Sequence, residues 1–97
     1  MLFRSARIAL LTEAGDVLRR ALARQPDDPN LMDPLASVIS DLAQEAEWSG
    51  DIASALEQLK EQSELIQRLI TCRPHEAFYR KAAAICERRR LALEATP

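Results

Sequence analysis

The sequence predicts an all-α fold of four antiparallel helices, and three observations lead to this prediction. Ala, Leu, Glu, Arg and Gln dominate over Val, Ile, Thr and aromatic residues, and only 2 of the 97 residues are glycine. These are the preferences of helices rather than of sheets. Apolar residues also recur at spacings of three and four, which is the period of an amphipathic helix. Finally, proline segments and one Gly-Asp pair divide the chain into four such stretches.

The first predicted helix covers about residues 2–24. Its apolar stripe consists of Ile8, Leu11, Leu18 and Leu22, with Gly15 at the missing position between them. Because glycine inside a helix costs about 1 kcal/mol relative to alanine, an alternative interpretation breaks the segment into two short helices at residues 14–16. We favour one continuous helix in which Gly15 permits the close approach of a neighbour.

The second predicted helix covers about residues 31–48 and follows a loop at residues 25–30. Proline removes a backbone donor and disfavours helical geometry in the residue before it, so Pro26 and Pro29 stop the preceding helix. We expect Asn30 or Asp33 to cap the new helix, with Pro34 in its first turn. Its apolar stripe is Leu35, Val38, Ile39, Leu42 and Ala46.

The remaining two helices are predicted at about residues 52–72 and 76–95. Gly50 can adopt the left-handed conformation that ends a helix, and Asp51 can cap the next one, so the second and third helices should form an antiparallel hairpin. Pro74 ends the third helix. The expected buried positions are Ile52, Ala55, Leu56, Leu59, Ile66, Leu69 and Ile70 in the third helix and Phe78, Ala82, Ile85, Cys86 and Leu93 in the fourth.

Length and composition predict a single globular domain over residues 1–97. With 47% hydrophobic and 29% charged residues, wholesale disorder is not expected. The net charge of -2 provides no field that would attract nucleic acid or an anionic membrane from a distance. The apolar run at residues 8–11 is far shorter than the roughly 20 residues that cross a bilayer. We therefore expect a cytoplasmic protein without a membrane segment.

No motif indicates an enzyme, a metal site or a cofactor site. Cys72 and His75 have a spacing that zinc ligands can use, but the remaining candidate, Cys86, occupies a core position and no fourth ligand completes a site. Two isolated glycines cannot build a phosphate-binding loop, and no recognised nucleophile motif surrounds the single histidine. The cysteines are also too few for a disulfide framework, in agreement with a reducing compartment.

Several surface candidates have competing interpretations. The basic group Arg80, Lys81, Arg88, Arg89 and Arg90 is expected to form a solvated helix face; contact with an acidic protein and contact with nucleic acid are the alternatives. Trp48 is expected to pack over the hairpin near Ile52 rather than stand exposed as an interface anchor. Tyr79, beside the predicted core residue Phe78, is the better candidate for an exposed contact.

The turn signals recur at a regular interval. Pro26 and Pro74 are 48 positions apart, and Gly50 lies 24 positions from each. Such spacing indicates one complete helical hairpin, preceded by the second helix of one unit and followed by the first helix of another.

These residues resemble the tetratricopeptide repeat family. The segment at residues 50–56, Gly-Asp-Ile-Ala-Ser-Ala-Leu, looks like the start of that repeat's second helix, and Pro74 looks like the proline that closes the unit. The 48-residue spacing is similar to long-helix variants in bacterial multidomain proteins, in which a segment like residues 21–28 links successive hairpins. The resemblance spans about residues 18–83. Because the fourth helix is highly basic and the first lacks a Gly-Asp start, a four-helix bundle with a similar hairpin stays open.

The resemblance implies an adaptor, scaffold or chaperone-like protein that binds another protein or peptide in a groove. The first helix of each hairpin would form that groove, and here these are the second and fourth predicted helices. The predicted contact residues are Ser37, Asp41, Gln44, Glu45, Tyr79, Arg80 and Arg88. One alternative is a bundle that self-associates through the first and fourth helices. Another, less favoured, is a nucleic-acid accessory protein that uses the basic face of the fourth helix.

Overall fold

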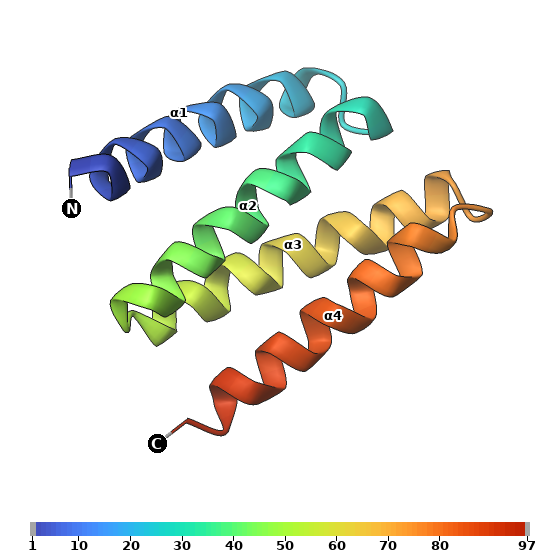
Figure 1. Ribbon diagram of the computed structural model, residues 1–97. Helices are drawn as coiled ribbons and strands as arrows, with labels where there is room; N and C mark the ends of the chain where they lie inside the picture. Colours follow the sequence, from blue (N-terminus) through green and yellow to red (C-terminus); the bar gives the residue numbers. More distant parts are fainter. Residues whose placement is uncertain (1, 97) are drawn as a thin grey trace.

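The computed structural model describes residues 2–96 and shows four helices (Figure 1). These are α1 (Leu2–Arg24), α2 (Pro29–Ser49), α3 (Ile52–Cys72) and α4 (Ala77–Glu94), and the described part of the chain contains no strand. The predicted all-α fold is therefore confirmed. The predicted bounds of α1 and α3 agree with the structure, whereas α2 begins two residues earlier than predicted and α4 is one residue shorter at each end.

Helix α1 is continuous through Gly15, so the interpretation as two short helices is wrong. Gly15 is buried, and a Cβ atom built there would lie 3.6 Å from Cγ1 of Val38 in α2, an ordinary van der Waals distance. Of the predicted stripe, Leu22 is buried and Leu11 and Leu18 are half-buried, whereas Ile8 near the start of the helix is exposed.

The start of α2 differs from the prediction. Asp28 caps the helix, because its Oδ1 accepts a hydrogen bond of 2.9 Å from the backbone N–H of Asn30. Pro29 occupies the first helical position, where a missing N–H costs nothing and the fixed φ already suits a helix. The predicted caps Asn30 and Asp33 are therefore wrong, and Pro34 lies beyond the first turn.

The turn between α2 and α3 confirms the predicted hairpin. Gly50 has φ 82°, in the left-handed region, and its N–H donates to the carbonyl oxygen of Glu47 at 3.1 Å. Asp51 caps α3 by accepting a 3.1 Å hydrogen bond from the N–H of Ser54. Both helix ends are thus satisfied within a few residues of chain.

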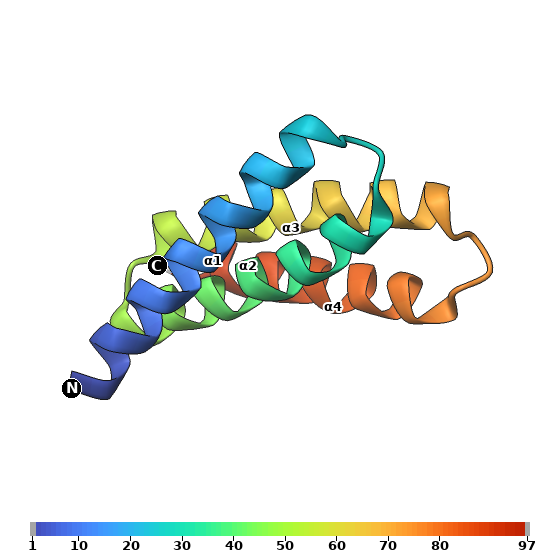
Figure 2. The same ribbon diagram turned by 90° about the horizontal axis from the view of Figure 1, so that it is seen from above.

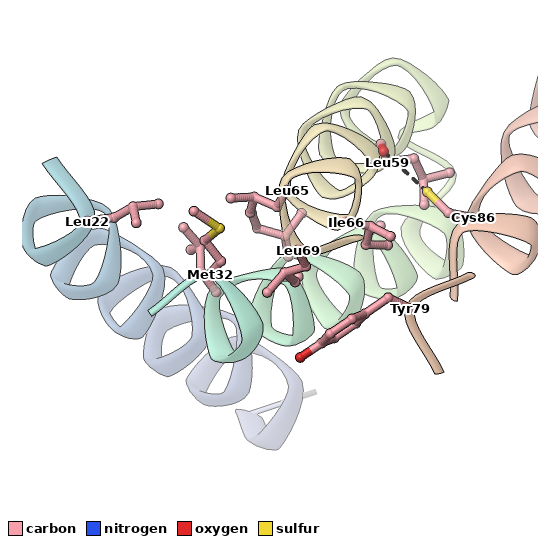
Figure 3. Close-up of a cluster of buried hydrophobic side chains, with 12 residues drawn as sticks. Leu22, Met32, Leu59, Leu65, Ile66, Leu69, Tyr79 and Cys86 are labelled. Atoms are coloured by element: carbon pink, nitrogen blue, oxygen red, sulfur yellow. Dashed lines mark hydrogen bonds between the residues drawn. The ribbon is translucent and has the colours of Figure 1, made fainter. Parts of the chain in front are cut away.

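The helices form a flat molecule that measures 37 × 29 × 18 Å. Consecutive helices pack against each other, and α2 and α4 lie on one side, with α3 and the C-terminal half of α1 on the other (Figure 2). A continuous core runs between them, from Leu22 and Met32 through Leu65, Leu69 and Ile66 to Tyr79 and Cys86 (Figure 3). None of the described helices is both long enough and apolar enough to cross a membrane.

The two glycines should respond oppositely to alanine. We expect Gly50→Ala to destabilise the protein by about 1 kcal/mol, since its left-handed backbone penalises a Cβ atom. Gly15→Ala should stabilise it by up to about 1 kcal/mol through helix propensity, because the nearest atom, 3.2 Å from the new Cβ, is the flexible end of Arg19. Urea unfolding measures both; the same sign for both variants would contradict the prediction.

Candidate binding groove

Long side chains rather than backbone packing join α4 to α2. At one end, the buried Tyr79 donates a 2.8 Å hydrogen bond from its hydroxyl to Oδ2 of Asp33, and Nη1 of Arg73 donates to the same hydroxyl at 3.0 Å. At the other end, Nη1 of Arg89 donates to Oγ of Ser40 at 3.0 Å, and its Nε lies 3.6 Å from a carboxylate oxygen of Glu47. These two bridges connect α2 and α4 across the gap between them.

A groove of about 400 Å³ lies between the bridges. Its floor comes from α3 and its walls from α2 and α4, and most of its surface is apolar. Phe78 and Ile85 of α4 line it and are 67% and 50% exposed. The ring of Phe78 packs edge-on against Tyr79, with centroids 5.8 Å apart. The other lining residues are Asp33, Ala36, Ser37, Ser40, Gln62, Ile66, Leu69, Tyr79, Lys81, Ala82 and Arg89.

Two polar atoms at this groove are buried without a partner. Gln62, which is only 8% exposed, has no donor for its Oε1 within residues 2–96, and Nη2 of Arg89 has no acceptor there. A buried polar group left unpaired costs about 1–3 kcal/mol, and most such groups in folded proteins are paired. Both side chains line the groove, so its floor and its α4 wall each contain one buried polar atom without a partner among these residues.

The structure buries part of the predicted contact set. Glu45 is 3% exposed and accepts hydrogen bonds from Arg4 at 2.8 Å and Arg7 at 2.9 Å, so its prediction as an exposed contact is wrong. Asp41 faces α1, and its Oδ2 lies 3.8 Å from Nη2 of Arg7. The side-chain amide of Gln44 donates a 3.4 Å hydrogen bond to the carboxylate of Glu47. The reason is that the C-terminal half of α2 lies against α1, a contact that the pattern of α2 alone does not reveal.

The buried face of α4 also differs from the prediction. Tyr79 is only 4% exposed, so its prediction as an exposed contact is wrong. Phe78 and Ile85 are exposed, so their prediction as core residues is wrong as well. The phenol of Tyr79 can be buried here because its hydroxyl donates a hydrogen bond to Asp33 and accepts one from Arg73. Of the predicted set, Ser37 and Tyr79 line the groove, while Arg80 and Arg88 are exposed on α4 outside its lining.

Sequence reasoning missed Phe78 and Ile85 as groove residues, together with Lys81 and Gln62. Phe78 and Ile85 are seven positions apart and therefore lie on one side of a helix. That spacing could have been read as a second apolar stripe beside the one that contains Cys86. No comparable signal identified Gln62, because a glutamine on an amphipathic helix is ordinarily solvated.

The basic group of α4 is partly neutralised by acidic neighbours. Arg90 donates to Glu94 at 2.6 Å and to Glu87 at 3.1 Å, and the hydrogen bond with Glu87 is the main cause that raises the pKa of Arg90. Arg89 is engaged with α2, as described above. Arg80, Lys81 and Arg88 are exposed and form no ion pair within residues 2–96.

Trp48 is 61% exposed, so the expectation that it packs over the hairpin is wrong. The guanidinium of Arg4 instead lies 5.2 Å from its ring centroid, a cation–π contact between α1 and α2.

The cysteines have separate environments. Cys86 is buried and its Sγ donates to the carbonyl oxygen of Leu59 at 3.3 Å, and burial raises the pKa of this thiol. Cys72 is exposed. In the part of the chain that is described, no three His, Cys, Asp or Glu side chains gather as metal ligands would.

Tyr79 should titrate above the ordinary pKa of 10.0, because burial and the bond to Asp33 raise the pKa of its phenol. The unfolded chain then loses this proton first, so the stability that depends on the neutral phenol is complete below pH 10 and falls at higher pH. Since Tyr79 is the single tyrosine, near-ultraviolet absorbance reports it directly.

Tyr79→Phe supplies the control for this titration. It should cost about 1 kcal/mol at neutral pH and remove the tyrosine-dependent part of the alkaline loss. An absorbance midpoint at or below that of the urea-unfolded chain would contradict the buried, hydrogen-bonded phenol.

A comparison with protein-family models, curated proteins and solved structures finds no match to this chain. The role of the groove must therefore be inferred from its own side chains.

Proposed function

We propose that this chain binds a segment of another protein in the groove between α2 and α4, acting as an adaptor or scaffold rather than as an enzyme. The observation that carries the proposal is the exposure of Phe78 and Ile85 beside an apolar hollow. Burial of one such side chain by a partner contributes about 1.5–3 kcal/mol. Burial of a polar side chain would contribute far less binding free energy.

The bridges at both ends support binding because they connect the two walls of the groove in the free protein, before a partner arrives. Tyr79 and Arg89 connect α4 to α2 by direct hydrogen bonds. A groove that exists in the free protein loses less conformational entropy on binding than one that must be formed.

We also propose that the chain is a helical repeat of the tetratricopeptide type. In that interpretation α2 and α4 are equivalent helices of successive units, and their common position on one side of the molecule supports it (Figure 2). We place this role in the cytoplasm, since the exposed Cys72 is a free thiol and suits a reducing compartment.

Self-association through α1 is the second candidate. Phe3, Leu10 and Val17 are exposed and recur every seven residues, so they form one apolar stripe on the outer face of that helix. Nucleic-acid binding has weaker support, because Arg89 and Arg90 are already engaged with acidic side chains.

Selection from a displayed library of random short peptides tests the groove. Ile85→Asp should weaken the selected peptides at least tenfold, since a charge replaces an apolar contact. Leu91→Asp is the matched control, because Leu91 is 51% exposed on the same helix but does not line the groove. The proposal fails if no peptide is enriched, or if both variants bind the enriched peptides alike.

Sedimentation equilibrium at several concentrations tests self-association. If the stripe on α1 joins two copies, the parent protein should show a concentration-dependent dimer and Leu10→Glu a monomer at all concentrations. A monomeric parent protein would exclude this candidate.

A further inference from the structure

We infer that the protein segment bound in the groove carries an acidic side chain beside its apolar ones, and that Lys81 and Arg89 receive that carboxylate. This inference rests on the proposed function and adds the chemistry of the partner. It follows from the charges and the unpaired polar atoms around the hollow.

Within residues 2–96, the charged side chains at the groove are matched by a partner except for one. Asp33 accepts the Tyr79 hydroxyl and lies 3.8 Å from Arg73, so its charge is already compensated. Glu47 lies 3.6 Å from Arg89. Lys81 lines the groove, is exposed and has no acidic partner within the described range. The unmatched charge of the groove is therefore positive.

Arg89 has one guanidinium nitrogen without an acceptor in the described part of the chain. Two of its three guanidinium nitrogens face Ser40 and Glu47, while Nη2 is buried and has no acceptor among residues 2–96. A carboxylate is the acceptor that pairs most strongly with a guanidinium N–H. Nη2 has almost no solvent-accessible surface in the free protein, so a carboxylate in the groove pairs with it once the guanidinium turns toward the groove.

Three groove residues are regularly spaced along α4. Lys81, Ile85 and Arg89 follow each other at intervals of four, so they share one side of the helix. Ile85 thus has the unmatched cation of Lys81 one turn away in one direction and the unpaired Nη2 of Arg89 one turn away in the other, so a carboxylate over Ile85 meets a donor on both sides.

The floor of the groove also contains an unpaired polar atom. Oε1 of Gln62 is a buried acceptor without a donor in the described part of the chain. Peptide segments carry N–H donors on their main chain, so a bound peptide can satisfy this acceptor when the buried amide turns toward the groove. An apolar ligand without polar groups would leave both Gln62 and Arg89 unpaired.

The experiment compares selections on the parent protein and on Lys81→Glu. Peptides are displayed through their C-terminal end, so every carboxylate they offer is a side chain. Peptides selected on the parent should be enriched in Asp or Glu next to apolar residues and should bind Lys81→Glu about tenfold more weakly. Arg80→Glu is the matched control, since it reverses an adjacent exposed charge outside the groove lining and should change affinity less than about twofold.

A second selection on Lys81→Glu itself should lose the acidic preference while retaining the apolar one. Unfolding midpoints measured for each variant establish that the fold is retained. Groove-dependent peptides without an acidic preference, or equal losses for Lys81→Glu and Arg80→Glu, overturn the inference and leave the proposed function standing. Peptides that are insensitive to Ile85→Asp overturn the proposed function itself.

Discussion

The packing of α3 against α2 is the constraint on which the rest of the structure depends. Ile39 and Ala43 from α2 and Ala55 and Leu59 from α3 have no exposed surface, and this is the most extensive helix contact in the molecule. The turn at Gly50 sets the antiparallel direction of the pair. Because interiors are close-packed, truncation of Ile39 or Leu59 would cost several kcal/mol, and the outer helices would lose the surface that positions them.

Polar contacts supplement the apolar packing that joins the outer helices to this hairpin. Arg4 and Arg7 of α1 pair with the buried Glu45, and Arg19 of α1 pairs with Glu61 of α3 at 2.9 Å. Tyr79 has the corresponding role for α4. Ion pairs with half-exposed partners contribute little stability, but a buried carboxylate must be paired, so such contacts determine how a helix lies more than how tightly it is held.

One consequence is that both outer helices keep large apolar side chains in solvent, in different settings. The stripe on α1 lies on the outer face of a terminal helix, whereas Phe78 and Ile85 border a hollow that also contains unpaired polar atoms. The unpaired oxygen of Gln62 costs free energy where it lies, since an apolar residue of similar volume would avoid it. This is why the hollow, rather than the outer face of α1, carries the functional proposal.

The sequence by itself determined the number of helices, the hairpin and the caps at Gly50 and Asp51, because these depend on propensity and on hydrogen bonds within a few residues. Only the tertiary structure decided which sides of α2 and α4 are buried. Glu45 is covered because α1 crosses that part of α2 with two arginines, and Tyr79 is buried in place of Phe78 because its hydroxyl meets Asp33, 46 positions away. Hydrophobic periodicity predicts that phenylalanine is buried in preference to tyrosine and that glutamate is exposed. It holds no information about hydrogen-bond partners so far away in the sequence.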